Sequence, residues 1–271
     1  RHRQRANETW HDISALIEGP VVADAAAHFA LLWNREKPRY RSIVEDWTAP
    51  ASRALMLDPL TDIGEADIEA SSLGKAVVQL ARTQSRKSGA MFARGPIGGI
   101  RELKAAHREV ILHARRQLYI EAQFFRSDDA ADWVEEALRR SPKLEVIILV
   151  ANAPEEIAFE GQTDNLAHRH GEYLQARALG RLLKKAGPSR VGLFTLAKHE
   201  KTKGSEKKYE KTRGTAYGSG LIHIHAKLLI VDDEILRIGS ANFNNRSMGL
   251  DSECDAFIDC ARPANSGCSE G

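Results

Sequence analysis

The second half of the chain alternates between short apolar runs and amphipathic segments. Residues 144–151 (LEVIILVA) form a continuous apolar run, which is typical of a strand buried on both faces. Residues 101–117 place apolar side chains on one helical stripe, and residues 171–186 form a second helical segment that Gly187 and Pro188 end. This alternation of strands and helices predicts an α/β layer fold with a central mixed sheet.

The remaining elements follow from the same periodicities. Ser127 is the predicted cap of a helix that runs to about Arg140, because two acidic residues occupy its first turn, where the helix dipole favours them. The other predicted elements are a helix over 15–34 and strands over 75–83, 118–125, 191–196, 221–231 and 235–238.

Three polar stretches interrupt this pattern. Residues 35–73 contain scattered prolines and indicate a surface connection, and the Ser/Gly/Lys-rich residues 84–99 are the best candidate for a domain boundary. Besides Lys198, residues 198–220 hold six basic and three acidic side chains. That stretch is either a solvated loop or a basic lip that attracts anionic groups.

Composition and charge narrow the classes of protein. Apolar residues make up 42% of the chain, which is enough for a core, and the net charge of +2 argues against a globally basic nucleic-acid binder. The apolar run at 146–151 is too short to cross a bilayer, and no basic-then-apolar leader begins the chain. We therefore expect a soluble protein, cytoplasmic or peripheral at a membrane surface. Because the chain begins at Arg1 within ordinary domain sequence, we also expect it to be truncated.

One compact signature occurs near the C-terminal end of the chain. It consists of six positions at fixed spacing: His225-x-Lys227-x4-Asp232-x6-Gly239-Ser240-x-Asn242. At about 5% average usage for each residue type, a chance match is on the order of 10⁻⁸ per window. A second His-x-Lys-x4-Asp does not occur in the sequence.

The residue types of this signature suit chemistry on a phosphate diester. Strand periodicity places His223, His225 and Lys227 on one face of the predicted strand 221–231. An imidazole beside an ammonium is costly unless an anion lies between them, and a phosphate diester is such an anion. His225 can attack phosphorus or protonate a leaving oxygen, and Lys227 can neutralise the non-bridging oxygens.

The residues downstream supply further polar groups. Residues 232–234 read as a tight turn, after which the hydroxyl of Ser240 and the amide of Asn242 can bind phosphate oxygens. Glu253 leads a further predicted strand. Its carboxylate is expected to bind the far nitrogen of His225, which would fix the tautomer and support the imidazolium.

Two other interpretations of these residues remain open. His223-x-His225 is also a zinc spacing on a strand, although Lys227 would then point a cation at the metal. Ser240 could be a hydrolase nucleophile with His225 as its base, but its flanks lack the Gly-x-Ser-x-Gly elbow.

The stretch HIHAKLLIVDDEILRIGSANFNNRSMGLDSECD resembles the second of the two HKD motifs of the phospholipase D superfamily. Residues 101–125, with LYIEAQFF, resemble the opening of the second lobe in two-motif phospholipases D. Residues 10–12 and 19–34 resemble the segment after the first motif, and residues 75–83 the last strand of the first lobe. The main departure is that the first HKD motif is absent.

The resemblance implies a phospholipase D-like fold of α-β-α layers around a mixed sheet. Residues 1–90 are expected to form the C-terminal part of the first lobe, and residues 91–271 a nearly complete second lobe. In the family, two histidines share one site without a metal or another cofactor, and the histidine of the C-terminal motif is more often the acid and base than the nucleophile. The resemblance therefore implies the acid/base role for His225. Asp232 is expected to order the turn. The resemblance also implies that five further residues lie at the lobe interface or near the substrate: Trp10, His11, Asp12, Glu121 and Gln123.

The leading functional hypothesis is a phospholipid phosphodiesterase or phosphatidyltransferase that acts at a membrane surface. Its expected partner is the first HKD lobe of the same parent chain, or a second copy of this chain in a dimer, and no nucleic acid is expected. A nuclease of the same superfamily is the alternative enzyme, and an inactive binding fragment is the alternative without catalysis. The first-lobe sequence upstream favours the lipid branch, because small HKD nucleases resemble a single lobe.

Overall fold

A computed structural model describes residues 9–35, 76–86, 97–152, 165–197 and 221–261. The chain divides into two compact units, one formed by residues 1–15 together with 76–271 and the other by residues 16–75. The predicted connection at 35–73, apart from residue 35, and the basic stretch 198–220 lie outside the described residues.

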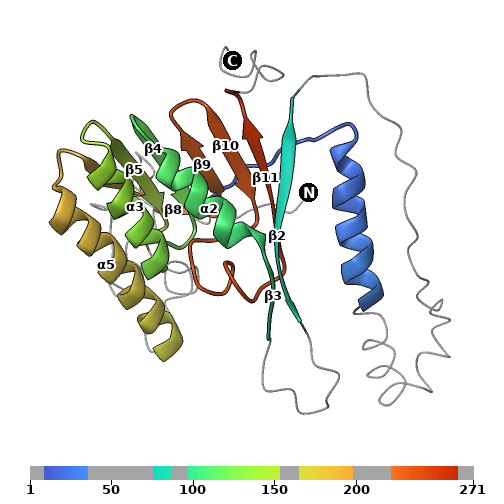
Figure 1. Ribbon diagram of the computed structural model, residues 1–271. Coiled ribbons are helices and arrows are strands. Elements are labelled where there is room, and N and C mark those ends of the chain that lie inside the picture. The colour runs from blue at the N-terminus through green and yellow to red at the C-terminus, as the bar shows by residue number, and fades with distance from the viewer. Residues whose placement is uncertain (1–8, 36–75, 87–96, 153–164, 198–220, 262–271) are drawn as a thin grey trace. The chain divides into compact units, whose positions relative to one another are not determined.

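The described part of the second unit is a helix over residues 21–35 (Figure 1). It begins later than the predicted start at residue 15. Gly19 adopts a φ of 105° that favours glycine, and the carbonyls of Gly19 and Pro20 accept the first hydrogen bonds, from Val22 and Ala23. Residues 15–18 precede this start and are extended or irregular.

Eight strands of the described residues form the main sheet of the first unit, in the order β3-β2-β11-β10-β9-β4-β5-β6 (Figure 1). β4, β5 and β6 pair in parallel, and the other neighbours pair antiparallel, so the sheet is mixed as expected. Its strands are β2 (Val78–Arg86), β3 (Ile97–Arg101), β4 (Gln117–Ala122), β5 (Glu145–Val150), β6 (Val191–Phe194), β9 (Lys227–Val231), β10 (Ile235–Gly239) and β11 (Glu253–Asp259).

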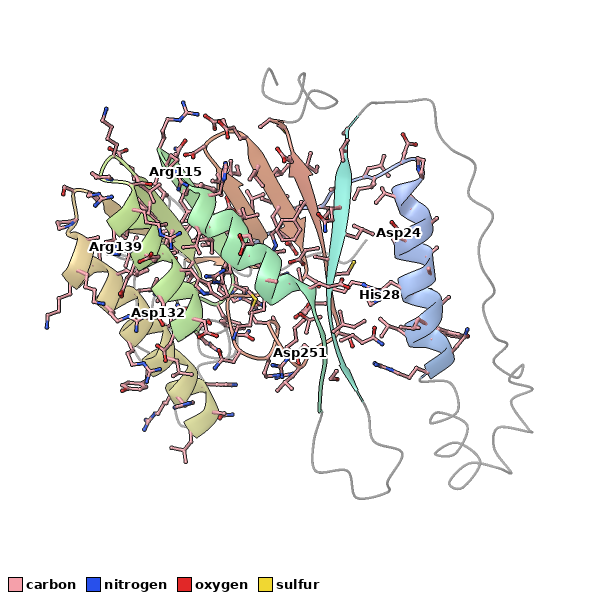
Figure 2. All side chains as sticks on the ribbon, viewed as in Figure 1. Asp24, His28, Arg115, Asp132, Arg139 and Asp251 are labelled. Carbon is pink, nitrogen blue, oxygen red and sulfur yellow. The ribbon has the colours of Figure 1, made fainter. Side chains whose placement is uncertain are left out.

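Three helices pack against one face of this sheet: α2 (Glu102–His113), α3 (Asp128–Arg140) and α5 (Leu166–Ala186). Ser127 accepts a hydrogen bond from the backbone N–H of Ala130, which confirms the predicted cap of α3. The polar side of α3 is exposed, as Asp132 and Arg139 show in Figure 2. Asp132 forms an ion pair with Arg181 of α5, so the two helices are joined outside the core as well as within it.

The opposite face of the sheet is also covered. A three-stranded sheet of the described residues is formed by β1 (Thr9–His11), β8 (Leu221–Ile224) and β7 (Leu196–Ala197). An apolar cluster joins Leu149 and Ala151, from the end of β5, to Ile224 and Ala226. Because Ile148 and Val150 of β5 point into the helix-covered core, β5 is buried on both faces as its apolar run predicted.

The predicted single strand over 221–231 is wrong. The structure breaks it at His225 and Ala226 into β8 and β9, which belong to different sheets. The backbone N–H groups of these two residues both donate to the carbonyl of His11, at 2.8 and 3.2 Å. The partner strand at this break, β1, lies 213 residues earlier in the sequence, so local periodicity could not reveal the break.

The sheet also continues across the expected domain boundary at residues 90 and 91. β2 and β3, on either side of that boundary, pair antiparallel, and β2 pairs with β11. The strand expected to end the first lobe is therefore part of the same sheet as the signature strands.

Candidate active site

Five of the six signature residues gather at one end of the strands of the main sheet, whereas Asp232 lies at the other end, beside the start of β4. Lys227 at the start of β9 lies opposite Ala122 at the end of β4. Gly239 at the end of β10 lies opposite Asp255, near the start of β11. This is the carboxyl edge of the parallel strands, where α/β proteins commonly bind ligands.

The strand break separates the three residues that periodicity placed on one face. His223 is buried, with its Nε2 atom 3.4 Å from Nε2 of Gln123 and its ring 5.0 Å from that of Trp10. His225 remains 36% exposed, whereas Lys227 is buried. His225 is therefore the histidine of the pair that a substrate can reach.

The partner of His225 is Asp12. Its carboxylate Oδ2 lies 2.8 Å from Nδ1 of His225, and the ring of Trp10 lies 5.1 Å from the imidazole. Burial opposes the charge on Asp12, but the hydrogen bonds from His225 and from the backbone of Ile13, together with the nearby positive charges, outweigh it, so the pKa of Asp12 lies below its usual value. A carboxylate on Nδ1 fixes the tautomer and leaves Nε2 for chemistry.

Glu253 does not take the expected position beside His225. Its Oε2 atom accepts a hydrogen bond of 2.5 Å from the hydroxyl of Ser240, which itself accepts one from the backbone N–H of Cys254. Burial raises the pKa of Glu253. Among the described residues no hydrogen bond joins Glu253 to His225, because the segment at residues 10–12 already supplies the carboxylate.

The side chain of Lys227 is held close to His225. Its ammonium donates to the backbone carbonyl of His225, which leaves two of its three N–H groups for a ligand. Burial lowers the pKa of Lys227 to about 8, although the charges of Asp12 and Glu253 act in the opposite direction. A phosphate diester would supply the negative charge that this buried ammonium lacks.

Asp232 binds backbone rather than open space. Its carboxylate accepts hydrogen bonds of 2.7 Å from the N–H groups of Arg115, Arg116 and Gln117. Burial opposes the charge, but these three bonds outweigh it and hold the pKa of Asp232 below its usual value. Asp232 and Asp233 both have positive φ, 55° and 59°, as the two central residues of a type I′ turn require, and the N–H of Glu234 donates to the carbonyl of Val231 to close this turn.

A second carboxylate anchors the segment that carries Asp12. Oε2 of the buried Glu121 lies 2.7 Å from Nε2 of His11, and Oε1 accepts a hydrogen bond of 2.5 Å from the hydroxyl of Tyr119. Burial raises the pKa of Tyr119, and the bond to Glu121 raises it further. The sequence analysis did not predict a role for Tyr119. Its position two residues before Glu121 on a strand places both side chains on one face, which was a signal visible in the sequence.

Two further residues were missed, Arg237 and Asp255. Both are fully buried, and they form an ion pair beside the Gly239–Asn242 turn. The signal in the sequence was a lone arginine in the apolar strand Ile235–Gly239. Asn242 itself is half-buried, and its Oδ1 atom has no hydrogen-bond partner among the described residues.

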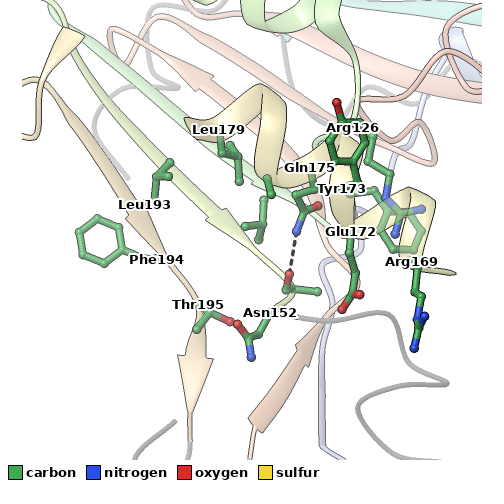
Figure 3. A pocket seen from close by; sticks show the side chains of 14 residues that line it. Arg126, Asn152, Arg169, Glu172, Tyr173, Gln175, Leu179, Leu193, Phe194 and Thr195 are labelled. Carbon is green, nitrogen blue, oxygen red and sulfur yellow. Dashed lines mark hydrogen bonds between the residues drawn. The ribbon is translucent and has the colours of Figure 1, made fainter. Parts of the chain in front are cut away.

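A separate hollow of about 670 Å³ lies at the carboxyl ends of β5 and β6, beside α5 (Figure 3). Gln175 spans it, donating to the carbonyl of Ala151 at 3.1 Å. None of the predicted site residues lines this hollow. The candidate active site is therefore the cluster around His225 and Lys227.

None of the helices in the described part of the chain is long and apolar enough to cross a lipid bilayer.

Comparison with known proteins agrees with the signature. The family model described as cardiolipin synthase, PLD-like domain, matches residues 108–266, which is more than half of the chain. Phospholipase D1 from Homo sapiens is 29% identical in an alignment that covers 88% of this chain and 22% of that protein. Phospholipase D alpha 1 from Cynara cardunculus is 26% identical over 89% of this chain and 35% of its own length.

Among solved structures, phosphatidylserine synthase from Haemophilus influenzae superposes with a TM-score of 0.44 at 18% identity, covering 75% of this chain and 40% of that one. The chain spans about a fifth of the length of the animal phospholipases D1 that it matches. By the match to the family model and by the signature at residues 225–242, this chain belongs to the phospholipase D-like family.

Proposed function

We propose that this chain carries the second-motif half of the active site of a phospholipase D-type phosphodiesterase or phosphatidyltransferase. The observation that supports this most is the geometry at His225. Its ring is exposed, Asp12 holds Nδ1, and the ammonium of Lys227 lies beside it. A histidine oriented by a carboxylate, next to a buried cation, is suited to acid/base chemistry on an anionic phosphate.

In the proposed reaction His225 is the acid and base, and a histidine from a first HKD motif is the nucleophile. The nucleophilic histidine forms a bond to phosphorus while the bond to the head-group oxygen breaks, and Nε2 of His225 gives that oxygen its proton. Water or an alcohol then attacks phosphorus, the bond to the nucleophilic histidine breaks, and Nε2 of His225 takes the proton of the attacking group. Asp12 stabilises the imidazolium that is present before the first step and forms again in the second.

Lys227 and the Gly239–Asn242 turn have complementary roles. The ammonium of Lys227 neutralises charge on the non-bridging oxygens, and the side chain of Asn242 is a neutral partner for the same group. Ser240 acts partly through Glu253, because its hydroxyl proton points to that carboxylate. The mechanism needs no metal or other cofactor.

The proposed substrate is a phospholipid at a membrane surface, where the protein acts peripherally. Since one signature provides one such histidine, the complete site requires the first HKD lobe of a parent chain or a second copy of this chain. Nucleic acid is not a proposed substrate.

The test has two parts. The coding sequence upstream of Arg1 is read for His-x-Lys-x4-Asp, and the longest chain it defines is assayed for head-group release from phosphatidylcholine and phosphatidylglycerol vesicles. We expect release or exchange, and a loss of at least about 10²-fold on His225→Asn, the range general acid–base catalysis supplies. Activity that survives this substitution would contradict the mechanism. Cleavage of DNA in place of phospholipid would favour the nuclease instead.

A further inference from the structure

A fully buried ion pair lies directly behind the Gly239–Asn242 turn. Arg237 of β10 donates to Oδ2 of Asp255 of β11 through Nε, at 2.8 Å, and through Nη2, at 2.5 Å. Neither side chain is exposed. Ala241, whose backbone binds both side chains, belongs to an apolar cluster with Leu103 of α2 and Phe257 of β11. Charged side chains are almost never fully buried unless they are paired in this way.

The same two side chains bind the backbone of the turn. The second carboxylate oxygen of Asp255, Oδ1, accepts hydrogen bonds from the N–H groups of Ser240, at 2.8 Å, and Ala241, at 3.1 Å. Nη2 of Arg237 donates to the carbonyl of Ala241 at 2.6 Å. The pair therefore holds two donors and one acceptor of the turn that leads to Asn242.

Gly239 of the signature fits this arrangement. It lies directly opposite Asp255 in the antiparallel register. A Cβ atom at Gly239 would lie 2.0 Å from Oδ1 of Asp255 and 2.5 Å from its Cα. The glycine is thus required for the Asp255 carboxylate to pass over the strand and reach the turn.

The charges at this position balance without a third group. Besides each other, Arg237 and Asp255 interact electrostatically with His107 of α2, Lys227 of β9, and Glu253 and Cys254 of β11. Burial, and then the charge of Arg237, lower the pKa of His107 to about 3, so its ring is neutral. Its Nε2 atom lies 3.8 Å from Oδ2 of Asp255, too far for a hydrogen bond.

Stability alone is a weak explanation for such a pair. The cost of removing two charges from water offsets most of their attraction, and apolar replacements of buried pairs are often neutral or stabilising. Two buried nitrogens, Nη1 of Arg237 and Nε2 of His107, also have no hydrogen-bond partner among the described residues. Apolar side chains at these two positions could not form the hydrogen bonds to the turn, so we interpret the pair as a means of placing the turn.

We propose that Asp255, the buried partner of Arg237, is a positioning residue that sets the Gly239–Asn242 turn so that Asn242 faces the substrate phosphate and Ser240 reaches Glu253. This inference rests on the proposed function. Asp255 acts through the turn, because its two oxygens bind Arg237 and the backbone of Ser240 and Ala241. It predicts that an acceptor oxygen at position 255, and not the charge, is what the turn needs.

A pair of double variants separates these two properties. Arg237→Met with Asp255→Asn removes both charges and keeps an acceptor oxygen, whereas Arg237→Met with Asp255→Val removes the charges and the acceptor. Amide exchange at Ser240 and Ala241 is measured by NMR, and kcat and KM by head-group release in the longest available chain. Thermal unfolding checks that both variants are folded.

We expect the asparagine variant to keep slow exchange and a kcat within about threefold of the unsubstituted protein. The valine variant should exchange these two amides at least about tenfold faster and lose about 10²-fold in kcat with little change in KM, as for other lost contacts to transition-state charge. Equal kcat or equal exchange in the two variants would overturn the proposal.

The comparison remains decisive if a variant fails to fold or if the unsubstituted protein is inactive. If the valine variant does not fold, Asp255→Ala in the Arg237→Met background makes the same comparison without added bulk. If the unsubstituted protein releases no head group, the proposed function fails and the catalytic role of the pair fails with it. The exchange rates then still decide whether Asp255 holds the turn.

Discussion

Two side-chain pairs support the candidate active site, and they differ in nearly every physical respect. Asp12 and His225 are 50% and 36% exposed and share one hydrogen bond. Arg237 and Asp255 are fully buried, and their bonds extend into the backbone of a neighbouring turn. The comparison teaches that the group meant for chemistry stays accessible and lightly held, while its surroundings are fixed from within the core.

The largest difference between the pairs should be in stability. Arg237→Met leaves the Asp255 carboxylate buried and unpaired, so we expect the free energy of unfolding to fall by about 3–5 kcal/mol. Asp12→Asn, at the exposed pair, should lower it by at most about 1 kcal/mol. Urea denaturation measures both. A loss near 1 kcal/mol or less for Arg237→Met would remove the distinction between the two pairs.

The order should reverse when catalysis is measured. Asp12→Asn removes the charge that supports the imidazolium of His225, and we expect kcat for head-group release to fall by about 10²-fold, within the range of general acid–base effects. Asp24→Asn is the matched control, since it makes the same change at an exposed position on the helix at 21–35. If both variants keep full activity, Asp12 does not orient the catalytic histidine.

Asp232 tests whether a third carboxylate behaves like the buried pair. Its folded-state pKa lies below the usual value, so it stabilises the fold above about pH 4, the ordinary aspartate pKa, and this contribution is lost as pH falls below it. Asp232→Asn should cost about 1–3 kcal/mol at pH 7 and flatten the acid side of the stability profile. The exposed neighbour Asp233 provides the control, and an Asp233→Asn effect of equal size would contradict this reading.

The smallest effect should be a shift in the pH dependence of activity. Lys227 is charged below its pKa of about 8, so its stabilisation of phosphate oxygens is complete below that pH and lost above it. We expect kcat/KM to decline above about pH 8. Lys227→Arg should move that decline upward even if the maximal rate falls, because arginine keeps its charge. An unchanged alkaline limb would assign the decline to another group.

Local pattern predicted much of the main sheet and its helices. The cap at Ser127, the end of α5 at Gly187 and the buried strand β5 follow from residues close in sequence, whose effects do not depend on distant partners. Strand β3 was missed, because it lies in a glycine-containing stretch that reads as a break. The region 221–231 was predicted as one strand because its composition favours a continuous strand, whereas the structure divides it into β8 and β9.

The candidate site shows the same division. Its six signature positions were visible because motif residues are fixed along the chain. The partners of those residues were not: Asp12 lies 213 positions from His225, and Glu253 binds Ser240 instead of the imidazole. Arg237 was visible as a lone arginine in an apolar strand, but its partner Asp255 could be assigned only when the opposing strand is in place.

The sequence by itself determined the family, the alternation of strands and helices, and the chemical groups that the signature provides. The tertiary structure decided which carboxylate meets His225, where the signature strand breaks, and which side chains hold the turn at Gly239. The physical reason is the distance along the chain over which each interaction acts. Periodicity, caps and motif spacing act over a few residues, whereas hydrogen bonds and ion pairs at this site join segments that only the folded sheet brings together.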